Sequence, residues 1–380
     1  MNRNIAADGS RVSHYDYDLP SDRVARYPAA LRDESRLLAV DPDASGVAGR
    51  GVPAGSGTPF RHLRFSDVVS LFRPGDLLVV NESKVLPARL LGVKPTGARA
   101  EVLLLRPAGD DPALWEALVR PGGKLKPGRR VLIGPDLEVE MVDSAPGGGR
   151  LVRLHTSLPM EEALERYGRM PLPPYLEREE EALDRERYQT VYARVPGSVA
   201  APTAGLHFTQ DLLERLDAAG VERTAVTLHV GIGTFRPVEV DDPAHHELHH
   251  EWYEVPLAAA EAVRACRARG GRVWAVGTTA VRTLEAAADE TGEVRPGTGS
   301  TDLFIRPPYR FRVVRGLITN FHLPRSTLLM LVAALAGYDR TMAAYREAVA
   351  EGYRFYSYGD AMVVLPLDGD AHSRPVRDPA

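Results

Sequence analysis

The sequence predicts a layered α/β domain into which a small antiparallel, Greek-key-like β-barrel is inserted. Residues 160–380 alternate helical patterns with β-branched runs, which is typical of an α/β layered domain. Residues 75–155 instead carry short β-rich runs separated by Pro and Gly turns, at the spacing of a small barrel or sandwich. A chain of 380 residues is also longer than one small core requires, so two domains are expected.

We expect the α/β domain to comprise residues 1–75 and 156–380, and the barrel to comprise residues 76–155. Residues 41–59 (DPDASGVAGRGVPAGSGTP) are rich in Gly, Ala, Pro and Ser and cannot build a core. They are expected to form a flexible insertion. The strand-like runs LLAV and RHLRF on either side of it predict a hairpin that the insertion interrupts.

The individual elements follow from hydrophobic periodicity. Barrel strands are predicted at DLLVV, ARLLGV, AEVLLL, LWEALV, RVLIG, LEVEMV and GRLVRLH. In the α/β part, strands are predicted at RTAVTLHV, RVWAVG, VVRGLITN and AMVVL. Helices are predicted over residues 160–167, 210–219, 257–269, 280–289, 326–336 and 341–351.

The composition limits what the chain can be. The net charge of −4 gives no global sign of a nucleic-acid-binding protein. A single cysteine, Cys266, excludes an intramolecular disulfide framework and thiolate-rich metal sites, and its helical context predicts a buried position. No stretch approaches the ~20 apolar residues of a membrane span, and the first residues lack the apolar core of a signal peptide. A soluble cytoplasmic protein with no membrane partner is expected.

Four loops follow predicted strands and are rich in Gly, Thr, Asn or His. Ligands of open α/β sheets bind beyond the carboxyl ends of strands, so these loops predict a pocket. The first, PGSVAAPTAGLHFT, carries His207 as its one titratable group. The second, TLHVGIGTFRPV, carries His229 and two glycines, but it lacks the third glycine of a dinucleotide site and no helix follows it. An anion site there and a structural role both remain open.

The third and fourth loops have more specific features. In the third, Gly277-Thr278-Thr279 begins a predicted helix, where backbone N–H groups and hydroxyls favour a carboxylate or a phosphate, and Arg282 lies one turn further on. In the fourth, Asn320 and His322 lie in an otherwise apolar junction and need polar partners. Asp360 precedes the last strand and is either a turn aspartate or a carboxylate at the pocket rim.

Residues 246–250 spell H-E-x-x-H, the zinc-protease signature. That mechanism requires a helix, whereas Asp-Asp-Pro before the run and WYEVPL after it predict extended chain. No third ligand follows at a known spacing. A polar edge that serves acid–base or substrate contacts is therefore the preferred interpretation.

Positive charge is concentrated locally. Residues 84–130 contain ten Lys or Arg and four Asp or Glu, and residues 303–325 contain five Arg and no acid. Solvated faces and a polyanion-binding surface are both compatible with this pattern.

A set of segments distributed along nearly the whole chain carries a family resemblance. In chain order these segments are YDYDLP, ARYP, RDESRLL, GDLLVVNESKVLPARLLG, GRMPLPPYLER, DRERYQTVYARVPGSVAAPTAGLHFT, TLHVGIGTFRPV, VWAVGTTAVRTLE, TDLFIRPP, LITNFHLPRSTLLMLVAALAGY and YRFYSYGDAM. Together they resemble the S-adenosylmethionine:tRNA ribosyltransferase-isomerases of queuosine biosynthesis.

The resemblance implies a reaction. Members of the family move the ribosyl part of S-adenosylmethionine onto 7-aminomethyl-7-deazaguanine at the wobble position of tRNA and isomerise it, giving epoxyqueuosine and releasing adenine and methionine. It also implies an α/β domain with an inserted β-barrel, a cytoplasmic monomer, no metal, and the tRNA anticodon stem–loop as partner.

The resemblance also suggests roles for residues. A proton must leave the carbon beside the sulfonium and adenine must be helped to depart, and histidine suits both tasks near neutral pH. The catalytic candidates are His207, His229 and His322, with His246, His249 and Glu251 as secondary acid–base candidates. The predicted S-adenosylmethionine-binding residues are Thr203, Gly205, Gly231, Gly233, Thr234, Gly277, Thr278, Thr279, Arg282, Asn320 and Asp360. The predicted tRNA-binding residues are Lys84, Arg89, Arg120, Lys124, Lys126, Arg306, Arg310 and Arg312.

This sequence departs from the family pattern at a few positions. Glu82 stands where the family usually carries Asn or Asp, Arg306 and Pro308 stand where Tyr and Gly are common, and the insertion at 41–59 is longer than usual. All lie outside the four loops, so they affect the expected tRNA contacts more than catalysis. A non-catalytic or acceptor-shifted tRNA-binding relative is the alternative. A conventional methyltransferase is disfavoured because no strand is followed by an acidic-Gly-x-Gly loop.

Overall fold

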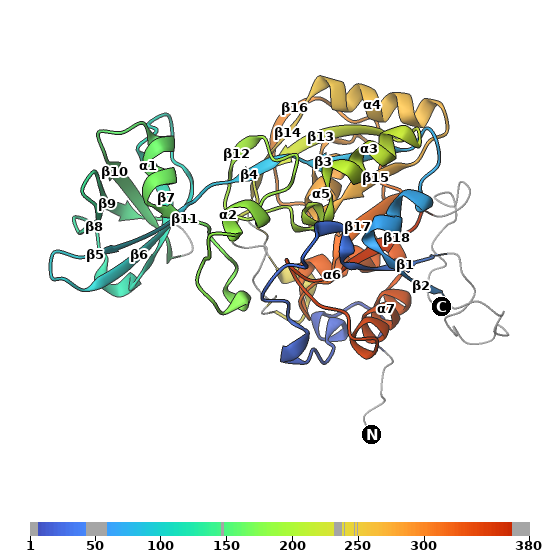
Figure 1. Ribbon diagram of the computed structural model, residues 1–380, viewed down its shortest axis with the longest axis horizontal. Helices are drawn as coiled ribbons and strands as arrows, with labels where there is room; N and C mark the ends of the chain where they lie inside the picture. Colours follow the sequence, from blue (N-terminus) through green and yellow to red (C-terminus); the bar gives the residue numbers. More distant parts are fainter. Residues whose placement is uncertain are drawn as a thin grey trace.

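The computed structural model describes residues 7–42, 59–145, 148–231, 238, 240–246, 248 and 250–366. It has two parts (Figure 1): a large mixed sheet covered by helices, and a small closed β-barrel beside it. The predicted fold class is therefore confirmed.

The large sheet has nine strands. Its order is β16 (Gly297–Thr301), β14 (Glu251–Val255), β13 (Glu222–Leu228), β3 (Leu77–Asn81), β15 (Val273–Val276), β17 (Gly316–Asn320), β18 (Ala361–Val364), β1 (Arg36–Val40) and β2 (Phe60–Arg64). Strands β13, β3, β15 and β17 are mutually parallel, so their carboxyl ends lie at one edge of the sheet. Towards both ends of the order the other pairs are antiparallel, except that β18 and β1 are parallel.

Alternate side chains of the central strands enter two different cores. Leu77 and Val79 of β3 pack with α4 (Leu257–Ala268), α5 (Gly277–Ala287), α6 (Thr327–Ala336) and α7 (Tyr338–Ala350). Leu78 and Val80 pack with α3 (Gln210–Ala218) and the 3-10 helix η4 (Phe65–Leu71) on the opposite face. This is the arrangement that buries both faces of a parallel sheet, and it explains why its strands are continuous apolar runs.

The barrel consists of six antiparallel strands. They are β5 (Arg89–Val93), β6 (Arg99–Pro107), β7 (Leu114–Arg120), β8 (Arg130–Gly134), β9 (Leu137–Ser144) and β10 (Arg150–His155). The order is β5-β6-β7-β10-β9-β8, and pairing of β5 with β8 closes the ring. Helix α1 (Met160–Tyr167) packs on the barrel core, and β11 (Gly168–Arg169) pairs with β5.

Strand pairing gives the barrel narrower limits than we expected. The run DLLVV was predicted as a barrel strand. It forms β3, which pairs with β13 and β15 in the large sheet. The short β4 (Ser83–Val85) pairs with β12 (Val195–Ser198) between the two parts, and α2 (Asp184–Arg187) precedes β12. The closed ring thus spans residues 89–155, not 76–155. A continuous apolar run indicates that a strand is buried on both faces. It does not indicate which sheet contains the strand.

Other elements agree with the sequence. Strands β1 and β2 form the predicted hairpin, while most of the insertion between them, residues 43–58, lies outside the described residues. Helix α5 begins at Gly277, three residues before the predicted start. Cys266 is buried in α4 as expected. None of the described helices is long and apolar enough to cross a membrane.

Candidate functional site

An open pocket lies at the carboxyl ends of strands β13, β15 and β17. Its empty volume, which includes space open to solvent, is about 640 Å³. Residues of all four predicted loops line it. The predicted site residues among them are Thr203, Gly277, Thr278, Thr279, Asn320 and His322.

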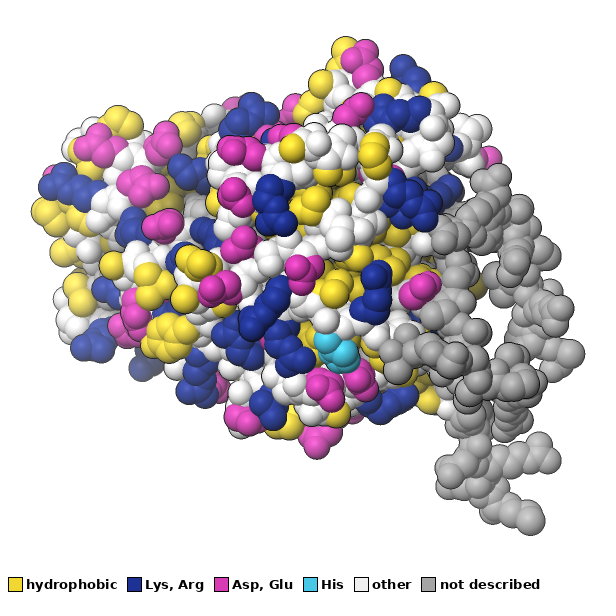
Figure 2. Space-filling model, turned by 45° about the vertical axis from the view of Figure 1, so that its right-hand side comes forward, with side chains coloured by type: hydrophobic (Ala, Val, Ile, Leu, Met, Phe, Trp, Pro, Cys, Tyr) yellow, Lys and Arg dark blue, Asp and Glu magenta, His cyan; other side chains and the backbone are white. Residues whose placement is uncertain are grey.

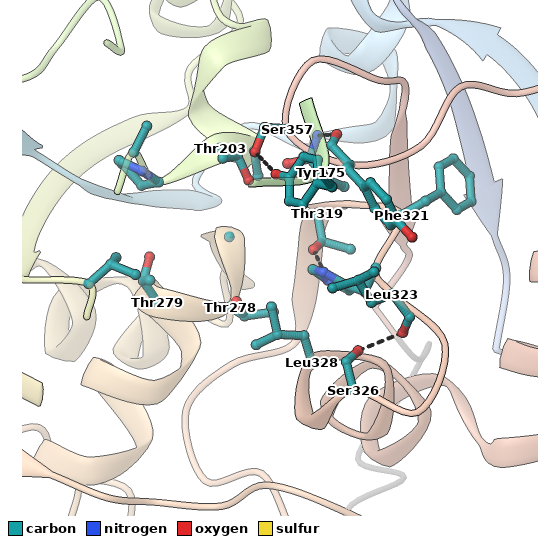
Figure 3. A pocket seen from close by; sticks show the side chains of 18 residues that line it. Tyr175, Thr203, Thr278, Thr279, Thr319, Phe321, Leu323, Ser326, Leu328 and Ser357 are labelled. Carbon is teal, nitrogen blue, oxygen red and sulfur yellow. Dashed lines mark hydrogen bonds between the residues drawn. The ribbon is translucent and has the colours of Figure 1, made fainter. Parts of the chain in front are cut away.

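The start of helix α5 forms one wall of the pocket (Figure 3). Gly277 has φ +83°, a conformation in which a side chain would be strained, so glycine is required where the chain turns from β15 into the helix. Thr278 and Thr279 follow and are both buried. Thr279 Oγ1 has no hydrogen-bond partner among the described residues. A helix N-terminus with an unpaired hydroxyl favours an anionic ligand group.

Asn320 ends strand β17 and lies 3% exposed. Its amide nitrogen donates to the carbonyl of Tyr356 at 3.2 Å, and this carbonyl fixes the amide orientation because it only accepts. The same nitrogen lies 3.0 Å from His207 Nε2. The oxygen, Asn320 Oδ1, has no partner among the described residues. Asn320 therefore offers the pocket a buried acceptor.

His207 lies behind Asn320 and does not line this pocket. Because Asn320 donates to its Nε2, its proton is on Nδ1, 2.7 Å from Ser35 Oγ. Its ring stacks on Phe65, with centroids 5.0 Å apart. Burial, with a smaller contribution from Arg354, lowers the pKa of His207 to about 3. His207 is thus an uncharged ring with both nitrogens engaged by the protein, away from the pocket where an acid–base group was expected.

His322 does line the pocket. Its Nε2 lies 2.8 Å from Thr319 Oγ1, and its backbone N–H donates to the Tyr345 hydroxyl. Burial lowers the pKa of His322 to about 3, so the imidazole is in its proton-accepting form at neutral pH. Among the three histidines first considered, it is the one at the pocket surface.

Sequence reasoning missed the opposite wall. Tyr175 and Tyr356 line the pocket with ring centroids 4.6 Å apart, and the hydroxyls of Tyr175 and Ser357 are hydrogen-bonded (Figure 3). Tyr356 has φ +72°, which is unusual for a bulky residue and marks a strained turn at the site. The aromatic runs PLPPY and FYSYG were present in the sequence, but neither follows a strand of the central sheet, so the strand-end rule did not select them.

Arg282 is engaged away from the pocket. Its guanidinium pairs with Glu251 of β14 and donates to the carbonyls of Leu303 and Thr301. Glu251 in turn accepts from the backbone N–H of Gly231 at 3.0 Å. Arg282 was expected to bind a carboxylate of the ligand, but it instead forms a buried ion pair with Glu251 that connects helix α5 to β14. The contact of Glu251 with Gly231 extends this connection to the second loop.

Other predicted residues have local structural contacts. Asp360 accepts from the backbone N–H groups of Arg36 and Arg354, which matches the turn interpretation rather than the pocket-rim one. A side chain at Gly205 would collide with the Tyr192 hydroxyl, so this glycine serves close packing. His229 stacks on Trp252 with centroids 4.9 Å apart. Burial lowers the pKa of His229.

The H-E-x-x-H run is only partly described. His246 follows a 3-10 turn (Pro243–His245) and contacts the Phe304 ring, and β14 begins at Glu251. None of its described residues is in an α-helix, which a zinc-protease site requires. Gly233, Thr234 and His249 lie outside the described residues.

The predicted tRNA-binding residues are distributed over both parts. Arg120, Lys124 and Lys126 are exposed at one end of β7 and the turn after it, whereas Arg89 pairs with Glu101 and Lys84 is half-buried in β4. Arg306 lies over the Phe304 ring. Arg310 and Arg312 are exposed. On the face drawn in Figure 2, Lys and Arg are interleaved with Asp and Glu rather than gathered in one patch of a single sign.

The departure at Glu82 has a structural explanation. Glu82 lies 6% exposed and receives two hydrogen bonds from Arg194, at 2.9 and 2.7 Å. Its backbone carbonyl also accepts from Arg194 and Val195. The acid therefore holds the β4–β12 pairing between the two parts, and it does not face the pocket.

Comparisons with known proteins agree on one family. The sequence model of the family described as "Queuosine biosynthesis protein" matches residues 12–364. An S-adenosylmethionine:tRNA ribosyltransferase-isomerase of Symbiobacterium thermophilum is 54% identical over 357 residues, 93% of this chain and 100% of that protein. The enzyme of that name from Thermus thermophilus is 53% identical over 92% of this chain and 98% of its own length. A crystal structure of S-adenosylmethionine tRNA ribosyltransferase from Thermotoga maritima has a TM-score of 0.51 and 38% identity, covering 92% of this chain and 99% of that chain.

Proposed function

The chain belongs to the family of queuosine biosynthesis proteins, and on this basis we propose that it transfers the ribosyl part of S-adenosylmethionine to tRNA and isomerises it. The acceptor is 7-aminomethyl-7-deazaguanine at the wobble position, the product is epoxyqueuosine-tRNA, and adenine and methionine are released. The observation that carries the proposal is the match to enzymes of this name, which covers 93% of this chain and 100% of the relative.

The pocket supports the proposal chemically. S-adenosylmethionine has a carboxylate, a sulfonium and a purine. The α5 N-terminus with Thr278 and Thr279 suits the carboxylate, because helix N-termini attract anions. The rings of Tyr175 and Tyr356 offer the purine an aromatic surface. Asn320 Oδ1 accepts a hydrogen bond from a substrate N–H or O–H group.

We propose that His322 is the base that removes the proton from the carbon beside the sulfonium. It lines the pocket, burial keeps it uncharged, and its Nε2 is oriented by Thr319. His207 is a positioning residue, since it contacts Asn320 and does not line this pocket. The exposed cations Arg120, Lys124 and Lys126 of the barrel face the anticodon stem–loop, where unstacked bases are read by stacking and polar contacts.

Product analysis tests the proposed reaction. The protein is incubated with S-adenosylmethionine and precursor tRNA, and the low-molecular-weight products are separated. Adenine and methionine are expected. S-adenosylhomocysteine as the product would identify a methyltransferase instead, and RNA binding without any cleavage of S-adenosylmethionine would identify a non-catalytic tRNA-binding relative.

We further propose that the protein acts as a monomer in the cytoplasm and needs no metal. Activity that is unchanged by a chelator and a molecular mass of one chain in solution are the expected results. Recovery of activity only on adding a divalent cation, or activity confined to a dimer fraction, would contradict these two statements.

A further inference from the structure

The pocket at the carboxyl ends of β13, β15 and β17 is called the reaction pocket below. A second, smaller cavity, with about 260 Å³ of empty space, lies on the other side of His207 from it. It is lined by Arg32, Ser35 and Arg187 together with His207 and Ser357, and Ser357 also lines the reaction pocket. The segments RDESRLL and DRERYQT, which supply both arginines, belong to the family resemblance, but the reaction outlined above gives them no role.

The two arginines are held in place by backbone carbonyls. Arg32 donates to the carbonyls of Leu206 and Glu186, at 3.1 and 2.9 Å. Arg187 donates to the carbonyls of Ala29 and Ala30. A carbonyl orients a guanidinium but does not neutralise it, so each group keeps its full charge and further N–H donors.

No carboxylate of the described residues lies within ion-pair distance of Arg32 or Arg187. Burial and the neighbouring charge of Arg187 lower the pKa of Arg32, and smaller contributions from Glu186, Tyr358 and Tyr192 oppose this effect. Other well-buried arginines of the protein are paired: Arg178 with Asp184, Arg272 with Asp76 and Arg282 with Glu251. Two adjacent, half-buried cations without an anion are an uncompensated arrangement.

We propose that Arg32 and Arg187 form a phosphate site that binds one backbone phosphodiester of the tRNA, next to the nucleotide whose base enters the reaction pocket. The cavity is small, and the two arginines that line it are half-buried, so a phosphate of the RNA backbone can reach them from solvent. The planar guanidinium groups match phosphate oxygens. Because the cavity shares Ser357 with the reaction pocket, a phosphate held there fixes the position of the adjoining nucleotide.

This phosphate site depends on the proposed function, in which tRNA is the substrate. The salt dependence of RNA binding tests the site. Affinity for a precursor anticodon stem–loop is measured from about 50 to 200 mM salt for the wild type, Arg32→Gln and Arg187→Gln. Each phosphate contact contributes roughly one unit to the slope of log affinity against log salt. Because both arginines contact the same phosphodiester, each Gln variant is expected to lose up to about one unit of slope and about tenfold in affinity at the lowest salt. Arg264→Met removes an exposed arginine of α4 and should keep the wild-type slope.

Charge-preserving variants cover the case in which the Gln variants do not fold. Arg32→Lys and Arg187→Lys should keep the slope but bind several-fold more weakly, because Lys cannot form the two-pronged contact. Wild-type slopes in folded Gln variants, or wild-type affinity in the Lys variants, would overturn the site.

A further measurement distinguishes binding of an RNA phosphate from binding of free inorganic phosphate. If inorganic phosphate raises the melting temperature of the wild type but not of the Gln variants while RNA slopes stay equal, the cavity binds a free phosphate and the RNA assignment is wrong. Adenine release by the wild type is measured in parallel. Its absence would reject the proposed reaction, whereas normal release with unchanged slopes would reject only this site.

Discussion

His207 and His322 are both kept uncharged by burial, but their ring nitrogens have different neighbours. In His207, Nδ1 faces Ser35 and Nε2 accepts from Asn320. In His322, Nε2 faces Thr319 and the side chain lines the pocket. His207 therefore acts through Asn320, whereas His322 is available to the substrate.

Kinetics of adenine release distinguish the two roles. His322→Ala should lower kcat by about 10² to 10⁴, the usual contribution of a general base. His207→Gln keeps an acceptor for Asn320 and should retain most of kcat, whereas His207→Leu removes this acceptor and should raise KM for S-adenosylmethionine. Equal losses of kcat in His322→Ala and His207→Gln, at unchanged melting temperatures, would contradict this division.

The lowered pKa values also predict how stability depends on pH. An unfolded histidine has a pKa near 6.5, whereas His207 and His322 titrate at about 3 in the folded protein. Between these values the unfolded chain binds more protons, so the unfolding free energy is highest above pH ~6.5 and falls as pH decreases towards ~3. The expected slope is about 1 kcal/mol per pH unit for each histidine.

Denaturant unfolding between about pH 7 and pH 5 measures this slope. His207→Gln should reduce it by about 1 kcal/mol per pH unit. A His207→Gln variant with the same pH dependence as the wild type would show that the pKa of His207 is the same in the folded and unfolded states, and would contradict the effect of burial.

Some of the individual residues that line the pocket could be predicted from the sequence. Thr278, Asn320 and His322 were predicted because they follow strands of a parallel sheet, and the geometry of such a sheet brings these ends together. Tyr175 lies in a short 3-10 helix and Ser357 in a turn, and the position of both depends on tertiary packing, so no local pattern indicated them. Residue type alone also gave His207 and His322 the same role, since only their contacts distinguish them.

At the scale of elements, the Arg282–Glu251 ion pair connects helix α5 to strand β14. Both side chains are less than a tenth exposed. Glu251→Gln leaves the arginine buried without its counter-charge, and the unfolding free energy should fall by about 3–5 kcal/mol. Glu293→Gln, which removes the partner of exposed Arg264, should cost less than about 1 kcal/mol. Similar losses for the two variants in urea unfolding would contradict a structural role for the buried pair.

Element boundaries show where sequence reasoning ends. Helices α1, α3 and α4 lie within one residue of their predicted limits, since their apolar faces repeat with the helical period. Strand β3 was predicted as a strand but placed in the barrel. Its partners β13 and β15 are far along the chain, and a short apolar run carries no information about pairing.

At the scale of the whole molecule, the barrel lies beside the α/β part and is joined to it through β4 and β12 (Figure 1). Many of its charges are paired, such as Arg106 with Glu116 and Arg130 with Glu138. The exposed Lys124 and Lys126 take part in no ion pair among the described residues, so they are the better candidates for RNA contacts.

Neutralising these two lysines tests the role of the barrel. Lys124→Gln combined with Lys126→Gln should raise KM for tRNA and reduce the salt slope of RNA binding by about one to two units, with KM for S-adenosylmethionine unchanged. Arg106→Gln is the control on the same domain. If tRNA binding is unaffected by the double substitution, RNA approaches the pocket over another surface.

The central claim is that this chain uses S-adenosylmethionine as a ribosyl donor for one modified base of tRNA. Its most direct test compares precursor tRNA that carries 7-aminomethyl-7-deazaguanine with the same tRNA carrying unmodified guanine, using S-adenosylmethionine labelled in the adenine ring and in the ribose. The account predicts release of labelled adenine and transfer of ribose label to tRNA with the precursor alone. Adenine release that does not depend on the precursor base, or ribose label that never enters tRNA, would contradict it.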